Sequence, residues 1–191
     1  MATAGPNFAG TGADDSSVGT VSWASPGNIT AEDAAVAGAT FSVNNSLTHY
    51  LKATNFGFAI PAGATIVGIL AEIKRQRNNN NTNSVFENSV KLLQGGTVGG
   101  TDQSAGTIFP PNTTGLTYKS YGSASDLWGR TWASSDINAS NFGLVLQAKG
   151  ATSGDGSYIG QVDSIRITIT YTPANTRSPS GGAAYSSPMF Y

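Results

Sequence analysis

The sequence has no cysteine among its 191 residues. Disulfide bonds, thiolate metal sites and cysteine nucleophiles are therefore excluded, and the redox compartment stays open. A single domain of this length can bury roughly 70% of its unfolded surface, so the chain can fold without such cross-links. Histidine is almost absent as well, since His49 is the only one. Catalysis by histidine therefore has one candidate residue.

Charge is also scarce, because only 11% of the residues are charged and the formal net charge is −1. Ordinary globular chains have roughly 25% charged residues, so Ser, Thr, Asn and Gly must supply most of the polar surface here. A nearly neutral surface gives little repulsion between copies of the chain. It also offers no concentration of Lys and Arg to neutralise phosphates, so we expect no nucleic-acid partner.

Long apolar runs are missing too. No run reaches the roughly 18 residues that a membrane helix needs, so we expect a soluble chain with no membrane partner. The first residues, Met1 to Pro6, have neither a basic n-region nor an apolar h-region. This start predicts no secretory signal and synthesis in a cytoplasm.

The sequence is instead rich in period-2 alternation, which is typical of β-strands with one buried face. The clearest strands are expected at Thr65 to Arg77 and at Ser164 to Thr172, where Ile165, Ile167 and Ile169 share one face. Weaker strands are expected at residues 20–24, 39–43, 48–53, 56–60, 85–94, 115–121 and 142–149. Nine strands without a long helix predict an all-β, two-sheet antiparallel β-sandwich.

Short helical turns are expected at two places between the strands. Residues 30–35 begin with Thr30 as a candidate N-cap and have Asp33 three positions later, and residues 134–139 form the second candidate.

The two ends of the chain lack the strand pattern. Residues 1–17 and 173–191 are rich in Gly, Ala, Ser, Pro and Asn, so we expect extended N- and C-terminal arms around a sandwich domain at residues 18–172. The C-terminal arm ends on apolar residues, which would find a better place in a groove on this chain or on a neighbour. The predicted partner-binding residues are Tyr185, Pro188, Met189, Phe190 and Tyr191.

The common catalytic motifs are missing. The sequence lacks the Gly-x-Ser-x-Gly elbow, the His-Glu-x-x-His zinc motif and the phosphate loop. His49 lies in an alternating stretch and is expected on a sheet face. A carboxylate pair for sugar hydrolysis stays open, with Asp126, Asp136 and Asp163 near the ends of predicted strands, but turn formation and capping also explain aspartates there. We assign no catalytic residue and expect no enzyme.

Metal and cofactor sites are not expected either. Asp14-Asp15 and Gly154-Asp155-Gly156 could supply oxygen ligands to Ca²⁺, but neither has the ligand spacing of a known calcium loop. The only basic cluster is Lys74-Arg75-Gln76-Arg77. At the end of a strand, this cluster is expected to form a solvated rim or a salt bridge between subunits.

The tryptophans allow two interpretations. Trp23, Trp128 and Trp132, with Tyr118 and Tyr121, could stack on a sugar ring, because carbohydrate-binding modules place exposed aromatic residues on a β-sandwich. Of these, Trp128 and Trp132 are the candidate stacking pair. Packing in the hydrophobic core is the alternative for the three tryptophans.

Four motifs in a fixed order carry a resemblance to a known module. They are Phe56-Gly57-Phe58-Ala59-Ile60-Pro61 continuing to Ile69, Asp126-Leu127-Trp128-Gly129 followed by Trp132, Asp136 to Gly143, and the closing Val162 to Tyr171. Together they resemble a β-sandwich module of tailed-bacteriophage virion structural proteins, over roughly residues 20–172. The resemblance rests on core and turn residues and transfers no functional residue. It implies a jelly-roll-like sandwich on a virion.

These observations favour a non-enzymatic virion structural protein. The expected role is a capsid decoration or cement protein whose arms bind the major capsid protein, or other virion proteins, and neighbouring copies. Homo-oligomerisation is expected, with a threefold arrangement preferred. The alternative is a tail or fibre component that binds host glycan through exposed Trp or Tyr residues, and the third hypothesis is a depolymerising or lytic enzyme.

Overall fold

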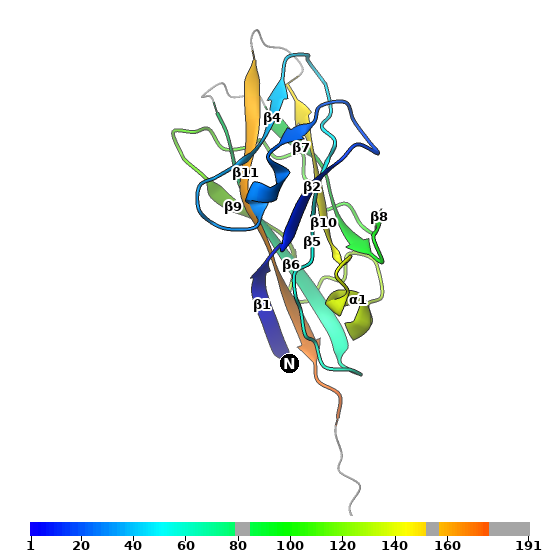
Figure 1. The fold of residues 1–191 in the computed structure, drawn as a ribbon. Helices are drawn as coiled ribbons and strands as arrows, with labels where there is room; N and C mark the ends of the chain where they lie inside the picture. Colours follow the sequence, from blue (N-terminus) through cyan, green and yellow to red (C-terminus); the bar gives the residue numbers. More distant parts are fainter. Residues whose placement is uncertain (79–84, 152–156, 176–191) are drawn as a thin grey trace, which may run out of the picture.

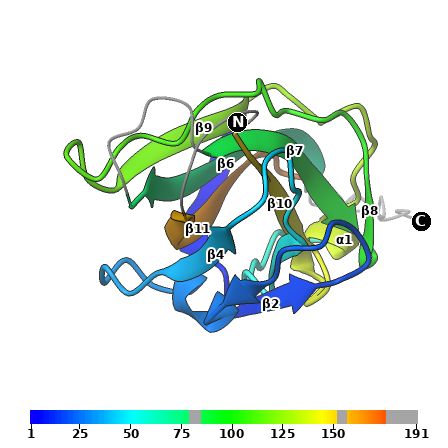
Figure 2. The same cartoon turned by 90° about the horizontal axis from the view of Figure 1, so that it is seen from above.

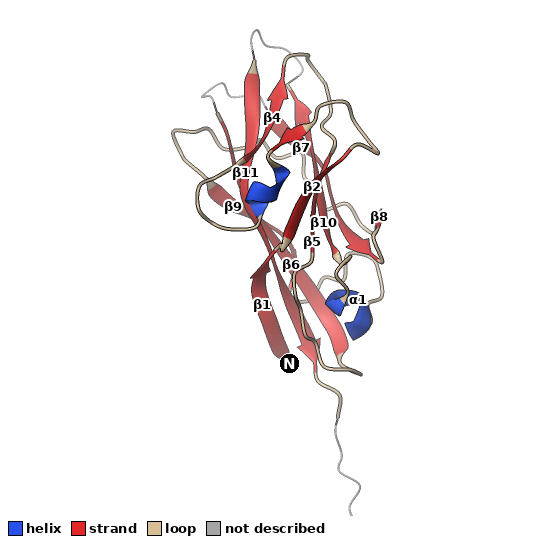
Figure 3. Cartoon of the chain, in the orientation of Figure 1, coloured by secondary structure: helices blue, strands red, loops and turns tan. Residues whose placement is uncertain are grey.

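The computed structural model describes residues 1–78, 85–151 and 157–175. Nearly all regular structure in these residues is β, arranged as two antiparallel sheets packed face to face (Figures 1 and 3). The predicted all-β sandwich is therefore confirmed. No helix in the described part of the chain is long and apolar enough to cross a membrane.

The two sheets have different strand orders. We call sheet A the one formed, in spatial order, by β3 (Trp23–Ala24), β4 (Ala37–Phe41), β11 (Tyr158–Thr172), β6 (Thr65–Arg77) and β9 (Thr117–Ser123), with β1 (Ala2–Phe8) also paired to β11. Sheet B has the order β2 (Thr11–Asp15), β5 (Tyr50–Thr54), β10 (Gly143–Gly150), β7 (Val85–Gln94) and β8 (Thr97–Gly99).

Strands β4 to β11 have jelly-roll topology. In sheet A they follow the order β4-β11-β6-β9, and in sheet B the order β5-β10-β7-β8. Successive strands mostly lie in opposite sheets, and these two strand orders are those of the two Greek keys that define an eight-stranded jelly roll. Figure 2 shows the two sheets from one end, with the chain crossing repeatedly from one to the other.

The two longest strands form the centre of the core. Ile165 of β11 pairs with Ile73 of β6, and Ile169 pairs with Ile69. These four side chains are fully buried. Burial of each one contributes roughly 1.5 to 3 kcal/mol, so the alternation that marks both strands in the sequence also fixes their register.

The N-terminal segment differs from the expectation. Residues 1–17 were predicted to be an extended arm, and that prediction is wrong, because β1 pairs with β11 and β2 pairs with β5. Between the two strands, the buried Ala9 donates its N–H to the carbonyl of Ile165 at 3.0 Å. Backbone pairing holds a segment whose small side chains give no strand signal, so tertiary context overrides local propensity.

Strands β4 and β1 share one edge of β11. β4 pairs with residues 158–162 and β1 with residues 166–171. Between them, Thr30 makes an isolated bridge to Ser164. The short 3₁₀ helix η1 (Pro26–Ile29) and the loop after it therefore cover a gap in this edge of the sheet.

Three local predictions meet different outcomes. Residues 56–60 were expected to be a strand but have no ladder partner, although their alternate side chains are buried. Residues 30–35 are not helical, and Thr30 donates its hydroxyl to the carbonyl of Gly27 at 2.9 Å instead of capping a helix. The second expected helical turn is present as α1 (Ser134–Asn138).

Both termini leave the sandwich at one end, because Ala2 is paired with Tyr171 (Figure 1). Residues 176–191 lie outside the described residues, and so do the five apolar residues predicted to bind a partner.

Candidate functional site

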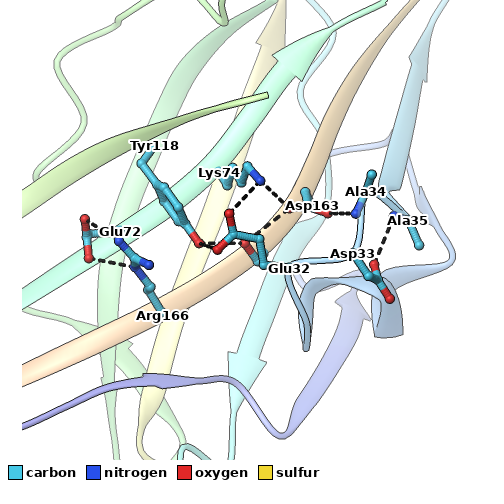
Figure 4. A network of polar contacts seen from close by, with 10 residues as sticks. Glu32, Asp33, Ala34, Ala35, Glu72, Lys74, Tyr118, Asp163 and Arg166 are labelled. Carbon is cyan, nitrogen blue, oxygen red and sulfur yellow. Dashed lines mark hydrogen bonds and ion pairs between the residues drawn. The ribbon is translucent and has the colours of Figure 1, made fainter. Parts of the chain in front are cut away.

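The densest group of charged side chains lies on the outer face of sheet A (Figure 4). The ammonium of Lys74 lies 2.7 Å from Glu32 and 3.4 Å from Asp163. Arg166 donates to both carboxylate oxygens of Glu72, at 2.8 and 3.2 Å. The ring of Tyr118 lies 3.9 Å from the guanidinium of Arg166, and its hydroxyl donates to Glu32 at 2.8 Å.

These surroundings favour the charged forms of Glu32, Lys74 and Arg166 and the neutral form of Tyr118. The hydrogen bond from Lys74 lowers the pKa of Glu32, and the same bond raises the pKa of Lys74. The hydrogen bond to Glu72 raises the pKa of Arg166, and desolvation raises the pKa of Tyr118. A general acid or base works best when its pKa lies near the working pH, and these shifts move each group away from it.

Asp163 anchors the loop that crosses this face. Its carboxylate is fully buried and accepts a hydrogen bond of 2.7 Å from the N–H of Ala34. Asp33 forms a local turn through the N–H of Ala35 at 3.0 Å. The network therefore fastens residues 30–36 to the sheet, which is the structural interpretation that the sequence left open for Asp163.

The other two candidate carboxylates also stabilise turns. Asp126 accepts from the N–H of Trp128 at 2.7 Å, and Asp136 accepts from the N–H of Ala133 at 2.9 Å. Gln103 and Gln94 donate to these two carboxylates, at 2.7 and 3.0 Å respectively.

The basic cluster at the end of β6 is divided between the two faces of sheet A. Lys74 lies on the outer face, whereas Arg75 and Arg77 are buried inside the sandwich. Arg75 forms an ion pair with the buried Glu87. The prediction of a solvated rim or an intersubunit salt bridge is therefore wrong for both arginines, because period-2 alternation sends them into the core.

His49 directly precedes β5 of sheet B. Its Nδ1 lies 2.8 Å from Asp14, and the other carboxylate oxygen of Asp14 accepts from the N–H of Trp23 at 2.9 Å. Within the described residues, the imidazole has no hydrogen bond to a hydroxyl that it could activate. No group of three or more potential metal-ligating side chains occurs there either.

The two tryptophans proposed for glycan stacking lie in the core. Trp128 is fully buried and donates its indole N–H to the carbonyl of Ile69 at 2.9 Å. Trp132 is 8% exposed and donates to the carbonyl of Leu127 at 2.9 Å. A buried ring has no free face for a sugar, so the stacking prediction is contradicted for this pair.

Three of the four motifs behind the resemblance meet in one corner of the sandwich. The rings of Phe56 and Phe58 lie 6.1 Å from the ring of Phe142, and Trp132 meets Phe142 edge to face at 5.5 Å. Asn138 binds both the N–H and the carbonyl of Ile60, at 2.8 and 2.9 Å. These residues therefore build the fold, which agrees with the expectation that the motifs contain core and turn positions.

The described surface is hollowed by a groove beside β4. It has a volume of about 360 Å³ and is lined by Thr20, Val21, Ser22, Ala24, Gly38, Thr40 and Ser42. Four of these residues carry hydroxyls and none is charged. Sequence patterns carry no signal for this site, because small polar residues look alike in a loop and in a groove.

The groove lies where the chain before β3 diverges from β4. β3 pairs with β4 only at Trp23 and Ala24, opposite Ala39 and Gly38. The residues just before β3 turn toward sheet B instead, where Val21 bridges to Thr48. The edge of β4 beyond Ala39 is therefore left without a partner strand among the described residues.

Exposed apolar side chains are rare on the described surface. The only large ones are Met1, at 90% exposure, and Val43, at 66%. Met1 lies at the end where both termini leave the fold, whereas Val43 follows directly after the groove residue Ser42.

No protein-family model matches the chain, and no curated protein or solved structure matches it. A functional proposal must therefore rest on the fold, the groove and the sequence of the ends.

Proposed function

We propose that this chain is a non-enzymatic structural protein of a tailed-phage virion, where it acts as a decoration or cement protein. It binds the head lattice and neighbouring copies, and its C-terminal residues make the main contact. Its localisation on this proposal is the virion, after synthesis in the host cytoplasm.

The observation that carries the proposal is the contrast between the sandwich and the tail. The described surface exposes only two large apolar side chains, and the charges on sheet A are paired with each other. The sequence from Pro188 to Tyr191 is nevertheless apolar. Burial of solvated apolar groups lowers the free energy, so this C-terminal tail, residues 176–191, is the best candidate for partner contact.

Two further features support the same role. By fold analogy, the jelly-roll strand order supports this role, because viral capsid domains use it. The charged groups on sheet A pair with each other and hold the loop at residues 30–36. We therefore expect a partner to bind through shape complementarity and backbone hydrogen bonds. The glycan-binding alternative has lost its candidate stacking pair, because Trp128 and Trp132 are buried.

The proposal is tested on particles. The full chain and a chain that ends at Asn175 are each produced with an epitope tag in the infected host, and the lysate is fractionated on a density gradient. The full chain should sediment with virions, whereas the shortened chain should stay in the soluble fraction while keeping the circular dichroism spectrum of a folded β-protein. A full chain that never sediments with virions would contradict the proposal, and equal incorporation of both chains would remove the tail from it.

A further inference from the structure

We propose that the groove beside β4 binds the C-terminal segment of a second copy of this chain, which adds to sheet A as an extra strand. The inference rests on the proposed function, because it names the place where the tail would clasp a neighbour.

The edge of β4 that faces β3 is open beyond Ala39 in the described residues. Pairing with β3 ends at Ala39. Of the groove-lining residues, Thr40 is the next residue in β4, and Ser42 directly follows the strand. An extended peptide can join such an edge through main-chain hydrogen bonds, and small pockets then select its side chains. The groove therefore lies in line with β3, at the place where a longer β3 would pair with the rest of β4.

The C-terminal sequence contains a segment whose chemistry suits this groove. Residues Ser180 to Ser187 form a run without proline, bounded by Pro179 and Pro188. Every residue of this run keeps its backbone N–H, as a strand requires. Its side chains are small apart from Tyr185, and none is charged. An uncharged run of small residues suits a groove of about 360 Å³ whose lining is small and uncharged.

Val43 directly follows the groove residue Ser42. It is the one large apolar side chain exposed near the groove in the described residues, at 66%. A tail in the groove would place an apolar side chain against Val43. Tyr185 is the candidate for this contact, because it is the only large side chain in the run from Ser180 to Ser187. Covering Val43 would remove an exposed apolar group from water.

The position of the termini favours a second copy over the chain's own tail. Thr40 beside the groove pairs with Ile159 near the start of β11, whereas the tail leaves after Thr172 at its far end. At about 3.3 Å per residue, that part of β11 is roughly 43 Å long. Residues 173–180 span at most about 28 Å when fully extended, so Ser180 of the same chain cannot reach the groove.

The resulting contact joins the tail end of one copy to the groove end of the next. Such a heterologous contact generates a ring if the rotation closes and a filament if it does not. Closure after three copies would give the threefold arrangement that is expected from the sequence.

The test uses engineered disulfides, because the natural chain has no cysteine that would interfere. Full-length chains with Ser42→Cys and with Ala183→Cys, one of them carrying a size tag, are mixed and oxidised. The hetero-disulfide dimer should form roughly tenfold faster than in a control mixture of Thr97→Cys with Ala183→Cys, because docking raises the effective thiol concentration. Thr97 is a matched control, since it is an exposed residue on the edge strand β8 of sheet B.

A second pair of variants tests the groove itself. Thr40→Arg places a charge in the groove and should reduce cross-linking between the Ser42→Cys and Ala183→Cys chains about tenfold, whereas Thr97→Arg should leave it unchanged. Equal cross-linking in the Ser42→Cys and Thr97→Cys mixtures would overturn the inference. In a chain with both Ser42→Cys and Ala183→Cys, an intrachain disulfide in place of linked copies would overturn the second copy as occupant.

The outcome is separable from that of the proposed function. Chains that sediment with virions but show no preferred disulfide would retain the virion role and remove the groove. Chains that cross-link through the groove but never join particles would support self-assembly and remove the virion role.

Discussion

Arg75 of β6 and Glu87 of β7 form an ion pair inside the sandwich and so connect sheet A to sheet B. The side chains are 3% and 0% exposed. Tyr121 donates its hydroxyl to Glu87 at 2.8 Å, and the ring of Phe109 lies 4.4 Å from the guanidinium. Each charge therefore depends on the other, because water cannot replace a lost partner at this depth.

Replacing Glu87 with Gln should lower the free energy of unfolding by about 3 kcal/mol, since it leaves the guanidinium of Arg75 buried without a counter-charge. Urea denaturation of the purified variant measures the loss. The double variant Arg75→Met with Glu87→Met is the control and should recover much of the stability, because it removes both charges together. An unchanged unfolding free energy for Glu87→Gln would show that the pair does not join the sheets energetically.

Asp102 should make the protein less stable in acid. Desolvation raises the pKa of this carboxyl, but hydrogen bonds from Ser89, Val90 and Ser104 outweigh it, so the pKa lies below its ordinary value. The stabilisation is therefore complete above the unfolded pKa near 4 and is lost as the pH falls through the folded pKa.

Thermal unfolding measured between pH 7 and pH 2 checks this expectation. The Asp102→Asn variant should show a smaller fall in melting temperature below about pH 4 than the natural chain. Parallel curves for the two proteins over this range would contradict the role of Asp102.

Much of the fold could be predicted because its central strands are amphipathic. The bounds of β6 and β7 were predicted correctly, and in β6 the buried Ile69, Ala71 and Ile73 alternate with less buried residues. The same rule could have placed Arg75 and Arg77 inside, because both share a face with Ile73. Sequence reasoning put charge ahead of periodicity there and so missed the buried ion pair.

The first strands and the groove could not be predicted in this way. β1 consists mainly of small residues, and its position depends on the backbone edge of β11, more than 150 residues later in the chain. The groove exists because only Trp23 and Ala24 pair with β4, whereas Val21, just before them, bridges to Thr48 instead. Long-range pairing decides both features, and local patterns do not contain it.

Gly122 should tolerate alanine poorly. It has a φ of +70°, and a Cβ there would lie 2.5 Å from the carbonyl oxygen of Ile69 and closer still to Nε1 of Trp128. Gly115 is the matched control, because its φ is +80° and a Cβ there would meet nothing within 4 Å.

Both alanine variants carry the backbone cost of roughly 1 to 2 kcal/mol for a left-handed residue, and only Gly122→Ala also disturbs the bond from Trp128 to Ile69. We expect Gly122→Ala to lower the melting temperature clearly more than Gly115→Ala and to change the tryptophan fluorescence. Equal melting temperatures would mean that the indole contact adds nothing.

The anchor between Asp163 and Ala34 should decide how firmly the loop at residues 30–36 is held. Asp163→Ala removes the acceptor for the N–H of Ala34 and should cost about 1 to 3 kcal/mol, because it also leaves a void at a fully buried position. Asp163→Asn keeps an oxygen that can accept this hydrogen bond and loses only the charge facing Lys74. Hydrogen exchange at the Ala34 amide should therefore be fast in the alanine variant and close to that of the natural chain in the asparagine variant. Fast exchange in both variants would instead assign the anchoring to the charge on Asp163, and slow exchange in both would leave Glu32 and Lys74 as the contacts that hold the loop.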